Sequence, residues 1–161
     1  MTEIYNSVID EVADILLQAR DEIRANMASQ NINASGRTSA GIQVERYEGG
    51  VRLVLTGNDV APLYTLETGR GAGRVPTGFT EILEQWSRDK GLTFANEQER
   101  RSFAYLLGRK IARQGTQRNM LPADVYSEPV NAALAKMKGR LRATISEYVR
   151  YITIGVQPHI K

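Results

Sequence analysis

Hydrophobic side chains recur at helical spacing along the N-terminal segment, with acids and arginines between them. This pattern predicts one long amphipathic helix over residues 2–29. At a rise of about 1.5 Å per residue such a helix is about 40 Å long, which exceeds the width of a small domain. We therefore expect part of it to pack on something other than its own domain. The apolar positions are Ile4, Val8, Val12, Ile15, Leu16, Ala19, Ile23 and Met27.

The pattern of a β-hairpin follows a loop over residues 31–41. Apolar and polar residues alternate over 42–45 and again over 51–56, and the glycines at 49 and 50 suit the turn between them. Alternation of this kind predicts one buried and one solvated face. Residues 60–67, "VAPLYTLE", predict a third, short strand at the sheet edge, where a proline is tolerated.

Three more helices are predicted after residue 78. The first carries Trp86 on its apolar face, where we expect it in the core, with an interface anchor as the alternative. The second is expected from the N-cap Asn96 to about Gln114, with Gly115 as its C-cap. The third covers about 129–150, and the β-favouring residues 151–156 predict a terminal strand. The apolar positions of the second and third helices are Phe103, Leu106, Leu107, Ile111, Val130, Leu134, Met137, Leu141, Ile145 and Tyr148.

The order of these elements predicts an α+β fold. A small antiparallel sheet, made of the hairpin and an edge strand, packs against the long N-terminal helix and three further helices. We expect a single domain over residues 1–161, because no repeat, low-complexity tract or linker divides the chain. Its parts are the helix at 2–29, the sheet at 41–67, a glycine-rich loop at 68–78, a helical part at 79–150 and a C-terminal tail at 151–161.

Charge is distributed unevenly along the chain. The net charge is only +3, yet residues 1–34 hold six acids and two bases, whereas residues 69–161 hold eight acids and sixteen bases. Such asymmetry fits a polyanionic partner, contacts between an acidic and a basic part of neighbouring molecules, or two solvated faces. There is no cysteine, which excludes disulfides and thiol catalysis and fits a reducing cytosol. We expect neither a signal peptide nor a membrane-spanning helix.

The loop "ETGRGAGRVPTGF" (67–79) looks at first like a phosphate-binding loop, but it matches neither nucleotide motif. A P-loop requires a Lys-Ser or Lys-Thr pair after its last glycine, whereas Gly73 is followed by Arg74, Val75 and Pro76. The dinucleotide fingerprint requires a different glycine spacing and a helix that begins at once. We therefore expect no nucleotide cofactor, and indeed no cofactor of any kind.

No set of catalytic residues is apparent. The only histidine, His159, lies three residues from the end, and without cysteine it cannot form the usual zinc sites or a serine triad. Two carboxylate pairs, Asp10 with Asp14 and Glu81 with Glu84, stand at helical spacing on faces expected to be solvated. We read Glu67 as the partner of an arginine in the adjacent loop. An enzyme is therefore not expected.

Binding of nucleic acid is the alternative that the basic C-terminal part leaves open. The expected helix at 97–114 is rich in arginine, and residues 136–142 add four more bases. Acids interrupt both runs, and no aromatic residues alternate with the bases for stacking. A small basic nucleic-acid-binding protein is thus the second interpretation, with phosphate contacts rather than sequence readout.

Four segments together resemble a known family. They are "INASGRTSAGIQVE", "APLYTLETGRGAGRVPTGF", "ILEQWSRDKGL" and "AYLLGRKIARQGTQ". Their succession, over roughly residues 30–120, is similar to that of the head–tail connector family, the small neck or tail-completion proteins of tailed bacteriophages. The shared features are an Ala-Ser-Gly loop, a Tyr…Glu-x-Gly segment, a tryptophan helix ending in Lys-Gly, and an Ile-Ala-Arg helix ending in Gly-Thr. No single segment is specific, and the order carries the resemblance.

The resemblance implies a virion structural protein without catalytic activity. Such a protein forms a homo-oligomeric ring, with sixfold or twelvefold symmetry, in the neck between the portal or its adaptor and the tail proteins. The ring is assembled in the cytoplasm of the bacterial host, joins head to tail and leaves a channel for the genomic DNA. Contacts within a ring are heterologous, so one face of each subunit must fit a different face of its neighbour.

Two groups of residues are then candidates for assembly. The glycine-rich loop is expected to contact a neighbouring subunit, with its glycines permitting close approach and its arginines pairing with carboxylates or facing DNA. An ordinary surface loop is the alternative. The loop candidates are Glu67, Arg70, Arg74 and Pro76. A second set, Arg109, Lys110, Arg113 and Arg118, is expected to line the DNA channel or an interface, unless it is simply solvated.

Overall fold

A computed structural model describes residues 2–56, 65–116 and 124–154 of the chain. It confirms the α+β class, with one antiparallel hairpin and several helices. The elements are α1 (Thr2–Ser29), α2 (Arg37–Gly41), β1 (Ile42–Tyr47), β2 (Gly50–Leu55), α4 (Phe79–Asp89), α5 (Glu97–Gln114) and α6 (Ser127–Ile154).

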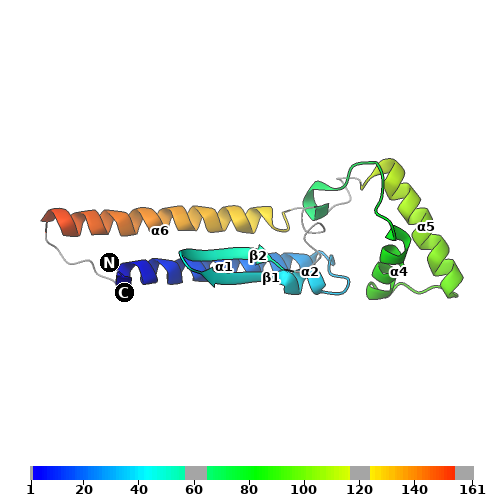
Figure 1. Ribbon diagram of the computed structural model, residues 1–161, viewed down its shortest axis with the longest axis horizontal. Coiled ribbons are helices and arrows are strands. Elements are labelled where there is room, and N and C mark those ends of the chain that lie inside the picture. Colours follow the sequence, from blue (N-terminus) through cyan, green and yellow to red (C-terminus); the bar gives the residue numbers. More distant parts are fainter. Residues whose placement is uncertain (1, 57–64, 117–123, 155–161) are drawn as a thin grey trace.

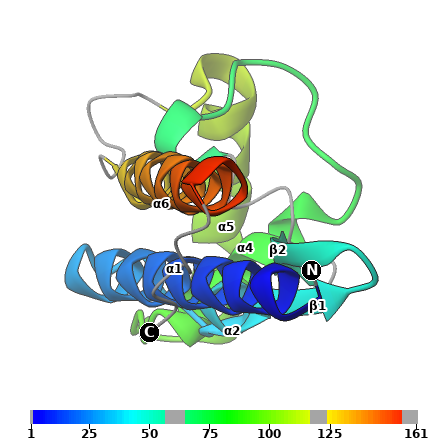
Figure 2. The same cartoon turned by 90° about the vertical axis from the view of Figure 1, so that its left-hand side faces the viewer.

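The molecule is elongated and has two ends of different construction (Figure 1). Helices α1 and α6 lie side by side and antiparallel along the long axis, and the hairpin of β1 and β2 packs on α1. Helices α4 and α5 form a separate helical hairpin at the opposite end. Figure 2, which looks along the long helices, shows α6 on one side of α1 and the strands beside it.

The hydrophobic core lies where α1, the hairpin and the start of α6 meet. Ile23 and Met27 of α1 are buried against Ile42 of β1 and Val125, just before α6. Burying an aliphatic side chain of this size contributes about 1.5–3 kcal/mol. A smaller cluster continues along the paired helices, made of Ile15, Ala19 and Ala133. The long N-terminal helix therefore packs on its own chain for much of its length.

Helices α4 and α5 approach each other closely because small residues face the contact. Ala104 is fully buried, and a Cβ at Gly108 would lie 3.5 Å from side-chain carbons of Leu83 and Phe79 of α4. Asn96 caps α5 as predicted, since its side chain accepts a 2.9 Å hydrogen bond from the Glu99 backbone N–H. The predicted end at Gly115 is also confirmed.

The hairpin is confirmed, with Ile42 opposite Leu55 and Tyr47 opposite Gly50, although β2 does not show the expected alternation of buried and solvated residues. The edge strand is not confirmed. Residues 65–67 form part of a helical turn, closed by a hydrogen bond from the Gly69 N–H to the Thr65 carbonyl, and residues 60–64 lie outside the described part. The described sheet has two strands.

Two further boundaries differ from the prediction. The loop expected at 31–41 ends in the short helix α2. Residues 151–154, expected as a strand, continue α6 instead, while 155–156 lie outside the described residues. Extending an existing helix adds a backbone hydrogen bond per residue without a new nucleation step, and this outweighs a local preference for strand.

Candidate functional site

The glycine-rich loop is held against the end of α5 by its own backbone. The Gly73 N–H donates to the Ala112 carbonyl at 2.8 Å, and the Thr116 N–H donates to the Arg70 carbonyl at 2.8 Å. The Arg70 N–H in turn donates to the Thr116 hydroxyl at 2.7 Å. These bonds satisfy groups that a helix C-terminus otherwise leaves unpaired. Two of the loop's N–H groups are thereby used inside the chain, which is not the arrangement of a phosphate cradle.

Gly115 makes this close approach of loop and helix possible. Its φ angle is +68°, and a Cβ at this position would lie 2.1 Å from the Arg70 carbonyl oxygen. Both features exclude a larger residue without rearrangement. From the sequence, Gly115 is predicted only as a helix cap, whereas in the structure it is also the contact point of the loop.

Glu67, at the start of the loop, caps the N-terminus of α6 instead of pairing with a loop arginine. Its carboxylate accepts hydrogen bonds from the backbone N–H groups of Tyr126 and Ser127, the latter at 3.0 Å. Partial burial raises the pKa of the Glu67 carboxyl, but bonds from the Ser127 hydroxyl and these backbone groups outweigh it, so the pKa lies below its ordinary value. The described contacts of Glu67 thus replace the predicted pairing with a loop arginine.

The two loop arginines have different surroundings. The Arg70 guanidinium donates to the Arg74 carbonyl and lies 5.6 Å from the centre of the Phe79 ring, so it braces the loop onto α4. Arg74 and Pro76 are exposed. Of the four loop candidates, the structure therefore gives Glu67 and Arg70 contacts inside the subunit and places Arg74 and Pro76 at the surface.

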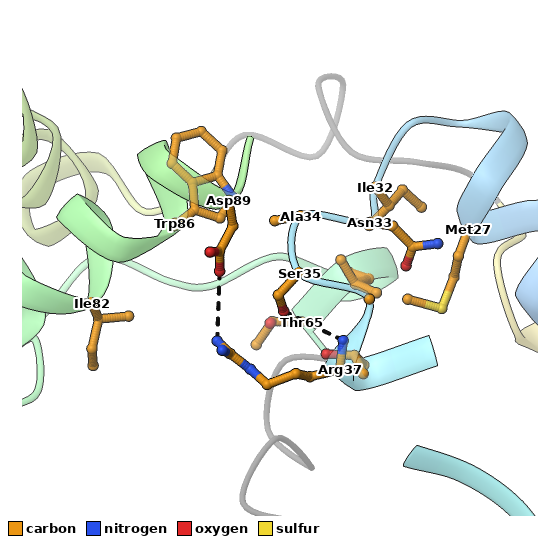
Figure 3. Close-up of a pocket in the computed structure, with 13 residues that line it drawn as sticks. Met27, Ile32, Asn33, Ala34, Ser35, Arg37, Thr65, Ile82, Trp86 and Asp89 are labelled. Atoms are coloured by element: carbon orange, nitrogen blue, oxygen red, sulfur yellow. Dashed lines mark hydrogen bonds and ion pairs between the residues drawn. The ribbon is translucent and has the colours of Figure 1, made fainter. Parts of the chain in front are cut away.

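A cleft of about 290 Å³ separates the segment after α1 from α4 (Figure 3). On its α4 side lie Ile82 and Trp86, and Trp86 keeps 38% of its surface exposed rather than entering the core. An ion pair of 3.7 Å between Arg37 and Asp89 crosses the cleft, as the dashed line in Figure 3 shows. The cleft is therefore spanned by a polar link between the two ends of the molecule.

Lys90 supplies a second link at the same place. Its ammonium group donates to the carbonyls of Asn31 and Asn33, the latter at 3.1 Å, just beyond the C-terminus of α1. That terminus carries negative partial charge, and the last turn of α1 contains no base of its own. The Lys-Gly pair predicts only the end of a helix, and this further role of Lys90 has no local signal because Asn33 lies 57 residues away.

The basic candidates on α5 are at the surface. Arg109, Lys110 and Arg113 are exposed, and the Arg109 guanidinium lies 5.7 Å from the ring centre of Tyr105. Arg118 lies outside the described residues. The three described bases are available to a partner, although nothing in their geometry selects DNA over protein.

Large apolar side chains are exposed at both ends of the molecule. On α5, Tyr105 and Leu106 are solvated, and Leu106 keeps 63% of its surface exposed although it belongs to the apolar stripe of the predicted helix. The buried face of α5 is instead that of Ala104 and Gly108. On α6 four of the large apolar side chains are exposed: Leu134, Leu141, Ile145 and Val149.

Two of the four carboxylates that stand in pairs at helical spacing have arginine partners. Asp10 forms a 2.7 Å ion pair with Arg46, and Glu84 lies within 4 Å of Arg88 and Arg101. Among residues 2–56, 65–116 and 124–154 there is no cluster of three acids or histidines that could hold a metal ion. In the same described part, every helix is too short or too polar to cross a lipid bilayer.

Comparison with protein-family models, curated protein sequences and solved structures finds no match for the chain. Its functional interpretation therefore depends on the segments quoted above and on the surfaces that the fold leaves open.

Proposed function

We propose that this chain is a virion structural protein of a tailed bacteriophage, which assembles into a ring in the neck between the portal or adaptor and the tail. The observation that carries the proposal is the exposure of large apolar side chains on α5, at one end of the elongated subunit, and on α6, which runs along the long axis beside α1. Exposed apolar surface of this kind marks sites of contact with other proteins. Two separate surfaces suit a subunit with a neighbour on each side.

The order of sequence segments that resembles the connector family supports the same proposal. In the folded chain those segments are close to one another: the glycine-rich loop contacts the end of α5, and the loop after α1 faces α4 across the cleft. The segments shared with the family thus form the junction of the molecule rather than separate surface features. Arg74 and Pro76 remain exposed there for contact with a neighbour.

The test is electron microscopy of a phage lysate in which this gene carries an early stop codon. We expect heads and tails that are complete but separate, and joined particles when the intact gene is supplied from a plasmid. Intact infectious particles without the protein would refute the neck assignment. A variant with a late synonymous change serves as the control for effects on neighbouring genes.

A nucleic-acid-binding protein is distinguished by a simple salt series. The exposed bases of α5 and α6 would give such a protein tight binding to random duplex DNA, with an affinity that falls steeply as salt rises. A neck protein through which DNA merely passes is expected to bind weakly at physiological salt. Tight binding together with intact particles in the stop-codon lysate would favour this second function.

A further inference from the structure

Helix α6 has an open apolar side next to its buried one. Ala133 is buried and Met137 partly buried against α1, whereas Leu134, Leu141 and Ile145 are exposed. The exposed residues are separated by seven and four positions, so they lie along one side of the helix, and Val149 continues the row. A helix that only covered its own core would have polar residues at these positions.

The bases of α6 fall into two groups around this open side. Lys136 and Arg140 line a groove against α1 of the same chain, where Lys136 donates to Gln18 at 3.4 Å. Lys138 and Arg142 follow Leu134 at steps of four residues and are exposed, so they flank the apolar row. Counting the whole of α6, five bases and two acids give +3.

Helix α1 as a whole has the opposite charge. Six acids and two bases give −4 for the helix, and the bases are engaged: Arg24 donates to the carbonyls of Ser39 and Ile42, and Arg20 pairs with Asp21. Asp14 and Asp21 are exposed seven residues apart, Asp14 at the edge of the groove that Lys136 and Arg140 also line, and Asp21 beside Arg20. Small or partly exposed apolar residues stand at helical spacing beside them, namely Leu17, Ala25 and Ala28.

We propose that the open side of α6 binds the acidic outer face of α1 of a second copy of the chain. The apolar row would pack on the small residues of the neighbour's α1, while Lys138 and Arg142 pair with carboxylates such as Asp14 and Asp21. The inference rests on the proposed ring, for it names the surfaces through which adjacent copies touch. The two surfaces differ, so the contact is heterologous and repeats from copy to copy.

Two charge-reversed variants test this contact, and the test does not require knowing how α6 and the neighbour's α1 are aligned along each other. The first carries Asp14→Lys and Asp21→Lys, and the second carries Lys138→Glu and Arg142→Glu. Each variant alone repels itself, and we expect its self-association, measured by sedimentation at low salt, to weaken by about tenfold or more. Mixed in equal amounts, the two should associate like the original chain, because every contact in an alternating assembly is again between opposite charges.

Three results would overturn the inference. They are an original chain that stays monomeric in concentrated low-salt solution, single variants that associate normally, and a mixture that stays monomeric. Circular dichroism and the melting temperature establish that each variant is folded. If a charge reversal unfolds the chain, two milder variants replace it. They are Asp14→Asn with Asp21→Asn, and Lys138→Gln with Arg142→Gln. They give the same contrast, measured as a salt-dependent weakening of self-association. A matched control, Glu48→Lys with Glu81→Lys at exposed positions of the hairpin turn and α4, should leave self-association unchanged.

Failure of this contact and failure of the neck assignment give different results. If plasmids that carry the variants restore joined particles to the stop-codon phage, whereas an empty plasmid does not, the neck role stands and the contact is wrong. If the mixture experiment succeeds but the stop-codon lysate contains intact particles, the contact stands and the neck role is wrong.

Discussion

Glu67 and Ser127 are 60 residues apart in sequence, yet the carboxylate of the first accepts a 3.0 Å hydrogen bond from the backbone N–H of the second. Through this bond the segment that begins the glycine-rich loop also fixes the start of α6. The same segment, a few residues later, bonds to the end of α5. One short stretch of chain therefore connects two helices that have few other contacts with each other.

Replacing Glu67 with glutamine should make stability less dependent on pH. The pKa of the Glu67 carboxyl is lowered in the folded chain, so its ionised form stabilises the fold above the ordinary value of 4.5. That contribution is lost as pH falls through the lower folded pKa. We expect the original chain to exceed the variant by about 1 kcal/mol at neutral pH, the usual effect of a helix cap, and the difference to close in acid. Denaturant titrations at several pH values measure it, and a constant difference would contradict the cap.

Gly115→Ala should destabilise the chain by more than about 1 kcal/mol, because the φ angle is positive and the new Cβ would overlap the Arg70 carbonyl oxygen. Gly139→Ala is the matched control. That glycine lies inside α6 with open space around its Cβ position, so alanine there should stabilise the helix by about 0.5–1 kcal/mol. Thermal melts of the two variants should thus shift in opposite directions, and equal shifts would refute the loop contact.

Removing the ammonium group of Lys90 should loosen the junction between the two ends. Lys90→Met keeps the aliphatic stem but leaves the carbonyls of Asn31 and Asn33 without their donor, at an expected cost of about 1–2 kcal/mol. Lys110→Met, at an exposed position on α5, should change stability by less than about 0.5 kcal/mol. Urea unfolding measures both, and similar effects of the two changes would argue against the link.

The loop arginines should separate stability from assembly. Arg70→Ala removes the bond to the Arg74 carbonyl and the contact with the Phe79 ring, and we expect a lower melting temperature. Arg74→Ala should leave the melting temperature unchanged, since the side chain is exposed. If Arg74 contacts a neighbour, this second variant alone should restore the stop-codon phage poorly. Normal restoration would remove Arg74 from the assembly surface.

Elements with strong local signals were predictable from the sequence. The period of apolar residues located α1, the alternation around Gly49 located the hairpin, and Asn96 with Gly115 bounded α5. Each of these signals is contained in a few consecutive residues, and no distant contact opposes it.

The misplaced features depend on distant partners. Residues 65–67 form a helical turn instead of an edge strand. This turn places Glu67 at the N-terminus of α6, and no local sequence pattern predicts that contact. Leu106 matches the helical period, but Ala104 and Gly108 allow the closer approach to α4, so Leu106 points outward. The apolar stripe predicted for α6 includes Leu134, Leu141 and Ile145, which are exposed, because periodicity alone does not tell which molecule covers a stripe.

The separation of the core from the α4–α5 hairpin has a consequence for dynamics. The large buried side chains of the main core belong to α1, the hairpin and the start of α6, whereas α4 and α5 bury little beyond Leu83 and Ala104. Regions with few buried contacts open locally at a smaller free energy than the rest of a fold. Amide hydrogen exchange should therefore reveal two cooperative units, with α4 and α5 exchanging together, well before α1.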